Sequence, residues 1–344
     1  MRRLVRLFAI LLLLTAGVAV IAVWRAHVWL DSPIAGLERD RVVEIEKGAS
    51  LRSIAQSLQA QGLLDQPEVW IVWARVTRQS AGIKAGEYQL TPGLTPRTLL
   101  KLLSSGQVIL HSITFIEGSR FIDVLKLLGA HEAVIHKAAT LSPEDLMQAL
   151  GAPGIHPEGQ FFPDTYRFPR GTSDLDLLAM AHRRLSQELD TAWNSRAQDL
   201  PLATKYEALI LASVVEKETA LESERPLIAG VFVERLKRGM RLQTDPTVIY
   251  GIGETYDGNI RRADLLRDTP YNTYTRSGLP PTPIALPGIE SLRAAVQPQM
   301  SGAVFFVATG KGDGSHYFSK TLAEHDAAVK RYLQQLRRPR LSTP

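Results

Sequence analysis

Two glutamates near the end of a largely apolar stretch are the residues best placed to do chemistry in this chain. They are Glu216 and Glu218, in the segment that begins at Tyr206. On a helix, at about 100° per residue, Glu218 lies in line with Leu211, whereas Glu216 points nearly the opposite way. Burial against apolar neighbours such as Val214 and Val215 disfavours a carboxylate and raises its pKa. Glu218 is therefore predicted to be a protonated general acid near neutral pH, as glycosidic cleavage requires.

A structural role for Glu218 is the alternative, because buried ion pairs also shift pKa values. Its partner would then be an arginine such as Arg225 or Arg241. Glu216, on the other face of the helix, is expected to meet solvent or a basic partner. Helix geometry alone leaves both roles of Glu218 open.

Other candidate chemistries are weaker. His131 and His136 are spaced i, i+5, which does not bring two imidazoles onto one helical face, so a solvent-exposed helix face is predicted there instead of a metal site. The glycine-rich run 310–314 lacks the spacing of a phosphate-binding loop and is predicted to be a hairpin turn. Ser213 lies at mid-helix outside any GxSxG motif, which makes a serine triad improbable.

A proline-rich segment carries three further candidates, Tyr271, Asn272 and Tyr274. The two tyrosines could stack on sugar rings and the asparagine could bond hydroxyl groups. Alternatively, the tyrosines anchor an irregular loop. Both interpretations remain open at this point.

Length and composition bound the scaffold that must hold these residues. The chain has 344 residues, 45% hydrophobic and 22% charged, which predicts two folded units and an additional segment. It contains no cysteine, which excludes disulfides, thiolate catalysis, cysteine-ligated metals and a lipoprotein lipobox.

The additional segment is apolar and lies at the N-terminus. Residues 7–24 carry no charge and follow Arg2, Arg3 and Arg6. Their length approaches the roughly 30 Å of a bilayer core, so a membrane anchor is predicted, with a cleavable signal peptide as the alternative. The arginines place the N-terminus in the cytoplasm and the rest of the chain outside it.

Hydrophobic periodicity and turn residues predict the elements that follow. A small α+β module contains strands at 42–45 and 87–90, a helix capped by Ser50 and stopped at Gly62, a helix over 69–76, and a helix from Thr95 to Gly106. A second part begins near His111, with a strand at 113–116, helices at 121–128, 146–150, 174–193 and 203–220, a helix to Lys237, a helix from Glu290, a hairpin over 304–319 and a last helix to Leu336.

Several motifs of the second part closely resemble one family. They are EKET (216–219), SER (223–225), GMRLQTDPTVIYG (239–251), YNTY (271–274), GLPPTPIALPG (278–288) and EGQFFPDTY (158–166). Together they resemble the endolytic murein transglycosylases of the YceG-like family, over almost the whole chain. Thr282 departs from the glycine that family members often carry there, without an evident chemical consequence.

The resemblance implies a membrane-anchored lyase that cuts nascent peptidoglycan strands between N-acetylmuramic acid and N-acetylglucosamine. It leaves 1,6-anhydromuramic ends, which would terminate glycan elongation. The family's catalytic glutamate falls on Glu218, and no metal or cofactor is implied, because the substrate's own hydroxyl replaces water as nucleophile. The candidate substrate-binding residues are Gln243, Asp245, Tyr271, Asn272, Tyr274, Glu158 and Asp164. Of these, Asp245 could instead cap a turn, and Glu158 and Asp164 could instead fasten their loop.

The predicted fold is α+β in three parts: a cytoplasmic stub and transmembrane anchor (1–30), a linker and LysM-like subdomain (31–108), and a mixed α/β catalytic domain (109–340). The LysM-like part would contact glycan, or serve only as a spacer. The resemblance implies a single-pass protein of the bacterial inner membrane with a periplasmic catalytic domain, associated with peptidoglycan synthases. The alternatives are a two-carboxylate hydrolase, pairing Glu218 with Glu216 or Glu222, and a non-enzymatic wall-binding scaffold.

The basic balance of the chain resides at its ends. The formal charge is +5, of which residues 1–30 contribute +4 and residues 330–344 contribute +5, which leaves −4 for the rest. A mildly acidic body does not favour nucleic acid as a partner. The C-terminal tail is expected to meet acidic wall polymer or membrane surface, or nothing.

Overall fold

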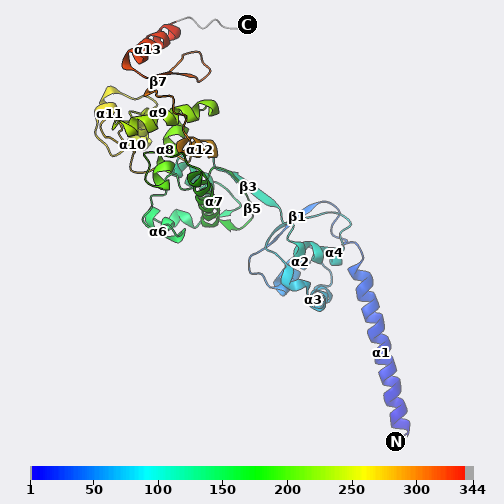
Figure 1. Ribbon diagram of the computed structural model, residues 1–344. Coiled ribbons are helices and arrows are strands. Elements are labelled where there is room, and N and C mark those ends of the chain that lie inside the picture. The colour runs from blue at the N-terminus through cyan, green and yellow to red at the C-terminus, as the bar shows by residue number, and fades with distance from the viewer. Residues whose placement is uncertain (1, 338–344) are drawn as a thin grey trace. The chain divides into compact units, whose positions relative to one another are not determined.

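The computed structural model describes residues 2–337, which divide into two compact units with both helices and strands (Figure 1). Residues 2–111 and 167–172 form the small unit, and residues 112–166 and 173–337 form the large unit. The prediction of a mixed α+β chain is confirmed. Arg338 and Arg340 of the predicted basic tail, and the predicted domain limit at 340, lie outside the described residues.

The small unit begins with one long apolar helix, α1 (Arg2–Leu30). Its most apolar 18-residue stretch has a mean hydropathy of 2.7, so α1 is long and apolar enough to cross a bilayer. The apolar side chains along α1 are exposed, including Leu13 at 71% and Val20 at 69%. Only Leu30, at the end of the helix, is buried.

The rest of the small unit packs helices on a two-stranded antiparallel sheet, in which Val43 pairs with Tyr88. The predicted helix start at Ser50 is confirmed, because its hydroxyl accepts from the backbone N–H of Ser53. Buried Tyr88 donates its hydroxyl to the carbonyls of Lys84 and Leu103, at 2.8 and 3.0 Å. The elements are β1 (Arg41–Ile45), α2 (Leu51–Ala60), α3 (Pro67–Val76), the 3-10 helix η1 (Gln79–Gly82), β2 (Gly86–Leu90) and α4 (Pro96–Ser105).

Two further two-stranded sheets join segments distant in sequence, β3 with β5 and β4 with β6. The strand predicted over 113–116 ends earlier, at Thr114. The helix predicted across His131 and His136 is wrong, because α5 ends at Gly129 and the chain turns into β4. The elements are β3 (Leu110–Thr114), α5 (Phe121–Gly129), β4 (Val134–Ile135), η2 (Ala138–Thr140), α6 (Pro143–Ala149), β5 (Thr165–Pro169) and β6 (Thr172–Ser173).

Helix α8 lies at the centre of the large unit, between α7, α9, α10 and α12. Its eight consecutive residues from Ala208 to Val215 are all buried. Around it are α7 (Asp174–Asn194), α8 (Lys205–Glu218), η3 (Glu222–Glu224), α9 (Arg225–Lys237), α10 (Asp245–Ile252), η4 (Gly253–Thr255), α11 (Arg262–Leu266) and α12 (Ile289–Val296). The chain closes with the antiparallel hairpin of β7 (Phe305–Ala308) and β8 (His316–Ser319), and with α13 (Leu322–Leu336).

A glycine lets the segment after α12 approach α9 closely. A Cβ atom at Gly230 would lie 2.2 Å from the carbonyl oxygen of Gln299, which belongs to the backbone and cannot turn aside. The backbone N–H of Gln299 donates in turn to the carbonyl of Pro226, at 2.9 Å. The two segments therefore meet through their main chains.

Gly230→Ala should destabilise the large unit by about 1–3 kcal/mol, since overpacking a fixed contact forces the backbone apart. Gly129→Ala is the matched control, because no heavy atom lies within 4 Å of the Cβ position there. Denaturant unfolding in detergent, followed by circular dichroism, measures both variants. Equal midpoints would contradict the close approach.

Candidate active site

Glu218 is the last residue of α8 and lines a pocket. Thr219, which follows it, has an extended backbone, so the helix ends at Glu218. The pocket has a volume of about 430 Å³ and is lined by Glu218, Thr219 and Ala220, together with residues of the β7–β8 hairpin. Glu218 keeps partial exposure there. The end of α8, a helix whose central residues are buried, thus contributes Glu218 to the wall of an open pocket.

The surroundings of Glu218 favour its protonated form near neutral pH. Burial raises its pKa to about 7, and the nearby charge of Asp245 acts in the same direction. A hydrogen bond from the Thr244 hydroxyl to Oε1 and the charge of Arg235 partly oppose this shift. A carboxyl group with such a pKa can both give and take a proton at neutral pH.

Thr244 is the N-cap residue of α10, yet its hydroxyl does not cap that helix. It donates to Glu218 instead. Thr244 is buried, and its backbone N–H donates to the hydroxyl of Thr273, at 3.1 Å. The hydroxyl of Thr247, also buried, pairs with the same Thr273 oxygen at 2.9 Å. Sequence analysis missed this threonine cluster; its one available signal was the N-cap position of Thr244 before Asp245-Pro246.

Arg235, on α9, is the second residue that sequence analysis missed. It is buried, and it donates from Nε to the carbonyl of Val304 and from Nη1 to the carbonyl of Leu242, each at 2.6 Å. These bonds fasten the segment that leads to Gln243 and Thr244. Its place just after the apolar run 227–233 of α9 gave no signal that distinguished it from the neighbouring charged residues Glu234 and Lys237.

The predicted alternative of an ion pair between Glu218 and an arginine is wrong. Arg225 pairs with Glu216, at 3.4 Å, and Arg241 donates to the carbonyl of Tyr274, at 2.9 Å. Within residues 2–337, neither arginine forms an ion pair with Glu218. Thr244 is the residue that bonds the carboxyl group.

Glu216 meets a basic partner, one of the two predicted outcomes. Besides Arg225, it accepts from the backbone N–H of Gly288 at 3.0 Å and from the Ser291 hydroxyl at 2.7 Å. Its side chain is only 6% exposed. Glu216 therefore fastens α8 to the start of α12.

Three of the sequence-predicted substrate-binding residues gather beside Glu218. Gln243 is exposed and has a φ of 50°, a left-handed conformation that is uncommon for a residue other than glycine. Asp245 accepts a hydrogen bond from the Tyr274 hydroxyl, at 2.6 Å. Asp245 and Glu218 both raise the pKa of Tyr274, although burial is the larger cause.

Tyr271 and Asn272 hold their loop together through internal contacts. Asn272 is buried, and its Nδ2 donates to the carbonyls of Asp264, Leu265 and Arg267. Tyr271 packs against Tyr250 with ring centres 4.7 Å apart, and its hydroxyl pairs with Thr282 at 2.9 Å. These contacts favour the anchoring interpretation for both residues, and they give Thr282 a role as a hydroxyl partner.

Glu158 and Asp164 also make contacts that fasten their loop. Glu158 is 4% exposed and accepts from the backbone N–H of Phe121 at 2.9 Å and from the Tyr250 hydroxyl at 3.1 Å. Burial raises its pKa to about 7. Asp164 accepts from the backbone N–H of Thr165, at 2.7 Å. No hydrogen bond among the described residues joins either carboxyl group to Glu218.

The β7–β8 hairpin forms another wall of the pocket. The hairpin turn predicted for the glycine-rich run 310–314 is confirmed. Gly310, Gly312 and Gly314 form its turn with positive φ values. Glu224 holds the hairpin through the backbone N–H and Nδ1 of His316, at 2.9 and 2.7 Å. No group of three or more potential metal ligands gathers within residues 2–337.

Ser213 has a structural role at the centre of α8. Its hydroxyl donates to the carbonyl of Ile210 at 2.7 Å and accepts from the backbone N–H of Ile284 at 3.0 Å. The side chain is completely buried. It fastens the proline-rich segment to α8.

Glu218→Gln should stabilise the protein at alkaline pH. The folded pKa of about 7 lies above the unfolded value, so the native state binds more protons between the two and loses stability as pH rises. The gain of the variant should approach roughly 3 kcal/mol above pH 8 and vanish below pH 4. Thermal unfolding across pH measures it, with Glu222→Gln, at an exposed glutamate, as the control. A pH-independent difference would contradict the elevated pKa.

Known proteins are similar in sequence to this chain over most of its length. It is 29% identical to an endolytic murein transglycosylase of Bacillus subtilis (strain 168) over 85% of this chain and 84% of that protein. It is 26% identical to an endolytic murein transglycosylase of Streptococcus pneumoniae (strain D39), of which it spans 58%. A crystal structure of a YceG-like protein from Listeria monocytogenes aligns with 84% of this chain and 99% of its own, with 29% identity and a TM-score of 0.47. The model of the YceG-like family matches residues 43–331, and the chain belongs to that family.

Proposed function

We propose that this protein is an endolytic lytic transglycosylase that cuts peptidoglycan glycan strands, with Glu218 as its catalytic acid and base. The observation that carries the proposal is the carboxyl group of Glu218, which has a pKa near 7 and lines a pocket at the end of α8. The names of the relatives from B. subtilis and S. pneumoniae support the same activity.

The proposed reaction needs one carboxyl group. Protonated Glu218 gives its proton to the oxygen that bridges N-acetylmuramic acid and N-acetylglucosamine, and the bond from C1 to that oxygen breaks. The resulting carboxylate then takes the proton from the C6 hydroxyl of the same muramic acid as that oxygen bonds to C1. The 1,6-anhydro ring closes, Glu218 is protonated again, and no water is consumed.

Thr244 and Arg235 serve the ionised half of this cycle. The hydroxyl of Thr244 donates to the carboxylate, and the positive charge of Arg235 favours it. Both effects are smaller than the effect of burial, so they stabilise the transient carboxylate without keeping Glu218 ionised beforehand.

The sugars are proposed to contact the residues beside Glu218. Gln243, Asp245 and Tyr274 would bond hydroxyl and acetamido groups of the strand. The other candidates would not touch the sugars but would hold the loops near the pocket in place; they are Tyr271, Asn272, Glu158 and Asp164. The internal hydrogen bonds of Asn272 and Glu158 support this division.

The proposal includes a place in the cell. The exposed apolar surface of α1 supports a single-pass anchor in the inner membrane, and the arginines before it support a cytoplasmic N-terminus. The remaining parts, a LysM-like subdomain (31–108) and a catalytic domain (109–340), would then lie in the periplasm. The order β1–α2–α3–β2 with an antiparallel sheet supports a LysM-like module. There the enzyme would end nascent strands in association with peptidoglycan synthases.

A two-carboxylate hydrolase is less well supported. Glu222, one candidate for the second carboxylate, is exposed and does not line the pocket of Glu218. Glu216 is the other candidate, but the N–H of Gly288, the hydroxyl of Ser291 and the guanidinium of Arg225 already bond it. A carboxylate with three donors is poorly suited to activate water. The lyase reaction requires no chemical role of Glu216, which only needs to fasten α8 to the start of α12.

Glu218→Gln should lower the rate of glycan cleavage by about 10²- to 10⁴-fold, the usual contribution of an acid–base group. Glu216→Gln is the matched control, since it alters a glutamate two residues away on the same helix and should retain most activity. The assay uses purified full-length protein and uncrosslinked glycan strands, with circular dichroism to verify folding. Full activity in Glu218→Gln, or loss only in Glu216→Gln, would refute the assignment.

The same digests identify the reaction type. Mass spectrometry should find anhydromuramic ends, one water lighter than reducing ends. Reducing ends with an inactive Glu218→Gln variant would favour the hydrolase, while strands left intact by the unaltered protein would favour a scaffold.

Thr244→Val should shift the alkaline limb of the pH–rate profile upward. The variant loses the hydrogen bond that lowers the pKa of Glu218, so the acid form persists to higher pH. Profiles of kcat/KM against pH for both proteins measure the shift. An unchanged limb would mean that the Thr244 bond does not act on the titrating group.

A further inference from the structure

A groove lies between the last turns of α1 and helix α3, both within the small unit. Its volume is about 410 Å³. The walls are mostly apolar, with alanine side chains from α1 and valine side chains from both helices, although His27 of α1 and Glu68 of α3 also line the groove. We call it the α1–α3 groove; its walls include Ala22, Val23 and Ala26 from α1 and Val69, Val72 and Val76 from α3.

Helix α3 is apolar on two faces. One face buries Trp70, Ile71 and Ala74 in the core of the small unit. The other face leaves Val72 58% and Val76 73% exposed. Water is a poor environment for such a face, because exposed apolar area forgoes the free energy of burial. A surface helix of a domain surrounded only by water would carry polar residues there.

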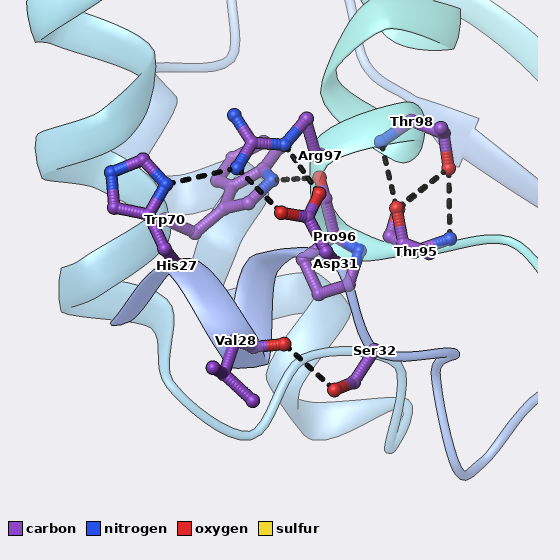
Figure 2. Close-up of polar contacts among 9 residues, drawn as sticks. All are labelled: His27, Val28, Asp31, Ser32, Trp70, Thr95, Pro96, Arg97 and Thr98. Carbon is purple, nitrogen blue, oxygen red and sulfur yellow. Dashed lines mark hydrogen bonds and ion pairs between the residues drawn. The ribbon is translucent and has the colours of Figure 1, made fainter. Parts of the chain in front are cut away.

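Polar contacts fix α3 at one level along α1 (Figure 2). Arg97 donates to both carboxylate oxygens of Asp31, at 2.6 and 2.9 Å, and its Nη2 lies 3.2 Å from Nδ1 of His27. Trp70 of α3 donates from its ring N–H to the carbonyl of Pro96, at 2.9 Å. Since Pro96 and Arg97 are adjacent in α4, they link α3 to the end of α1.

The guanidinium of Arg97 also lies 4.3 Å from the ring centre of Trp73, on α3. The His27 ring meets the same tryptophan edge-on, with centres 5.3 Å apart. One residue of α1 and one of α4 thus converge on Trp73 of α3.

The contacts between α3 and α1 lie near the C-terminal end of the uncharged segment 7–24. Ala22 and Val23 belong to the uncharged segment 7–24 of α1 and also form one wall of the groove. At about 1.5 Å per residue, Val23 lies only a few ångströms from the end of that segment. Val69, Val72 and Val76 of α3 line the same groove, so apolar side chains of α1 and of α3 share one surface there. Arg25 and Arg75, both exposed, flank this surface with charges that suit lipid phosphates.

We propose that the α1–α3 groove and the exposed face of α3 bind phospholipid of the bilayer that α1 spans. An acyl chain occupies the groove, and Val72 and Val76 lie in the boundary between headgroups and hydrocarbon. The proposal rests on the membrane anchoring given under Proposed function. The small unit would then contact the membrane through α3 as well as through α1.

Single cysteines test the proposal, because the chain has none of its own. Val72→Cys carries an environment-sensitive fluorophore, in full-length protein in phospholipid nanodiscs. Val42→Cys is the matched control, a valine of β1 that is 56% exposed and does not line the groove. Leu14→Cys, within α1, reports insertion. All three side chains are exposed, so no core packing is lost.

Nitroxide-labelled acyl chains should quench the fluorophore severalfold more at Val72 and Leu14 than at Val42. Quenching at Leu14 with none at Val72 would overturn this proposal and leave the anchor intact. No quenching at Leu14 would overturn both. A blue-shifted but unquenched label at Val72, seen only with several chains per disc, would assign the groove to a second copy and also overturn the proposal. Cleavage by Glu218 is measured separately, so its failure would not change these outcomes.

Discussion

The carboxyl group of Glu218 lies in a buried place where ionisation costs free energy, and two neighbouring groups reduce that cost. Burial acts against the carboxylate, and the negative end of the α8 dipole acts in the same direction. One hydroxyl and one arginine charge oppose them. With more donors the pKa of the group would fall toward that of an ordinary glutamate, and with fewer it would rise further. A near-neutral pKa requires this incomplete compensation.

The two glutamates of α8 show how the same residue type receives opposite environments two positions apart. A step of two residues turns a helix by about 200°, so the side chains meet different neighbours. Glu216 meets three donors and serves as an anchor, whereas Glu218 meets one. The proline-rich segment supplies Gly288 to Glu216 and Ile284 to Ser213. Polar groups on α8 therefore hold the segment whose Thr282 in turn bonds Tyr271.

Local patterns in the sequence predicted what depends on local physics. The cap at Ser50 and the glycine hairpin follow from capping and turn chemistry, and the structure bears them out. The helical period did not separate two faces of α8, because its residues from Ala208 to Val215 are all buried and the side chain of Glu216 is only 6% exposed. The helix predicted across His131 failed, because β4 forms by pairing with β6, far away in the sequence.

The partners of Glu218 could not be predicted for the same reason. Thr244 lies 26 residues from it, and Arg235, whose charge acts on its pKa, bonds Val304, 69 residues from Arg235 itself. Neither contact leaves a periodic signal. Tyr271 and Asn272 show a related limit: the residue types suited both sugar contact and anchoring, and only their packed neighbours distinguish the two.

One carboxylate organises the chain where it leaves the small unit and where it returns to it. Glu87, on β2, bonds Nε2 of His111 and Nε of Arg170, each at 2.6 Å. Burial raises the pKa of Glu87, but the hydrogen bonds from these two partners outweigh it and hold the pKa below its ordinary range. His111 lies on β3, which carries the chain out, and Arg170 follows β5, which brings it back. One ionised side chain of β2 therefore bonds a residue of each of the two segments, in addition to the pairing of β3 with β5.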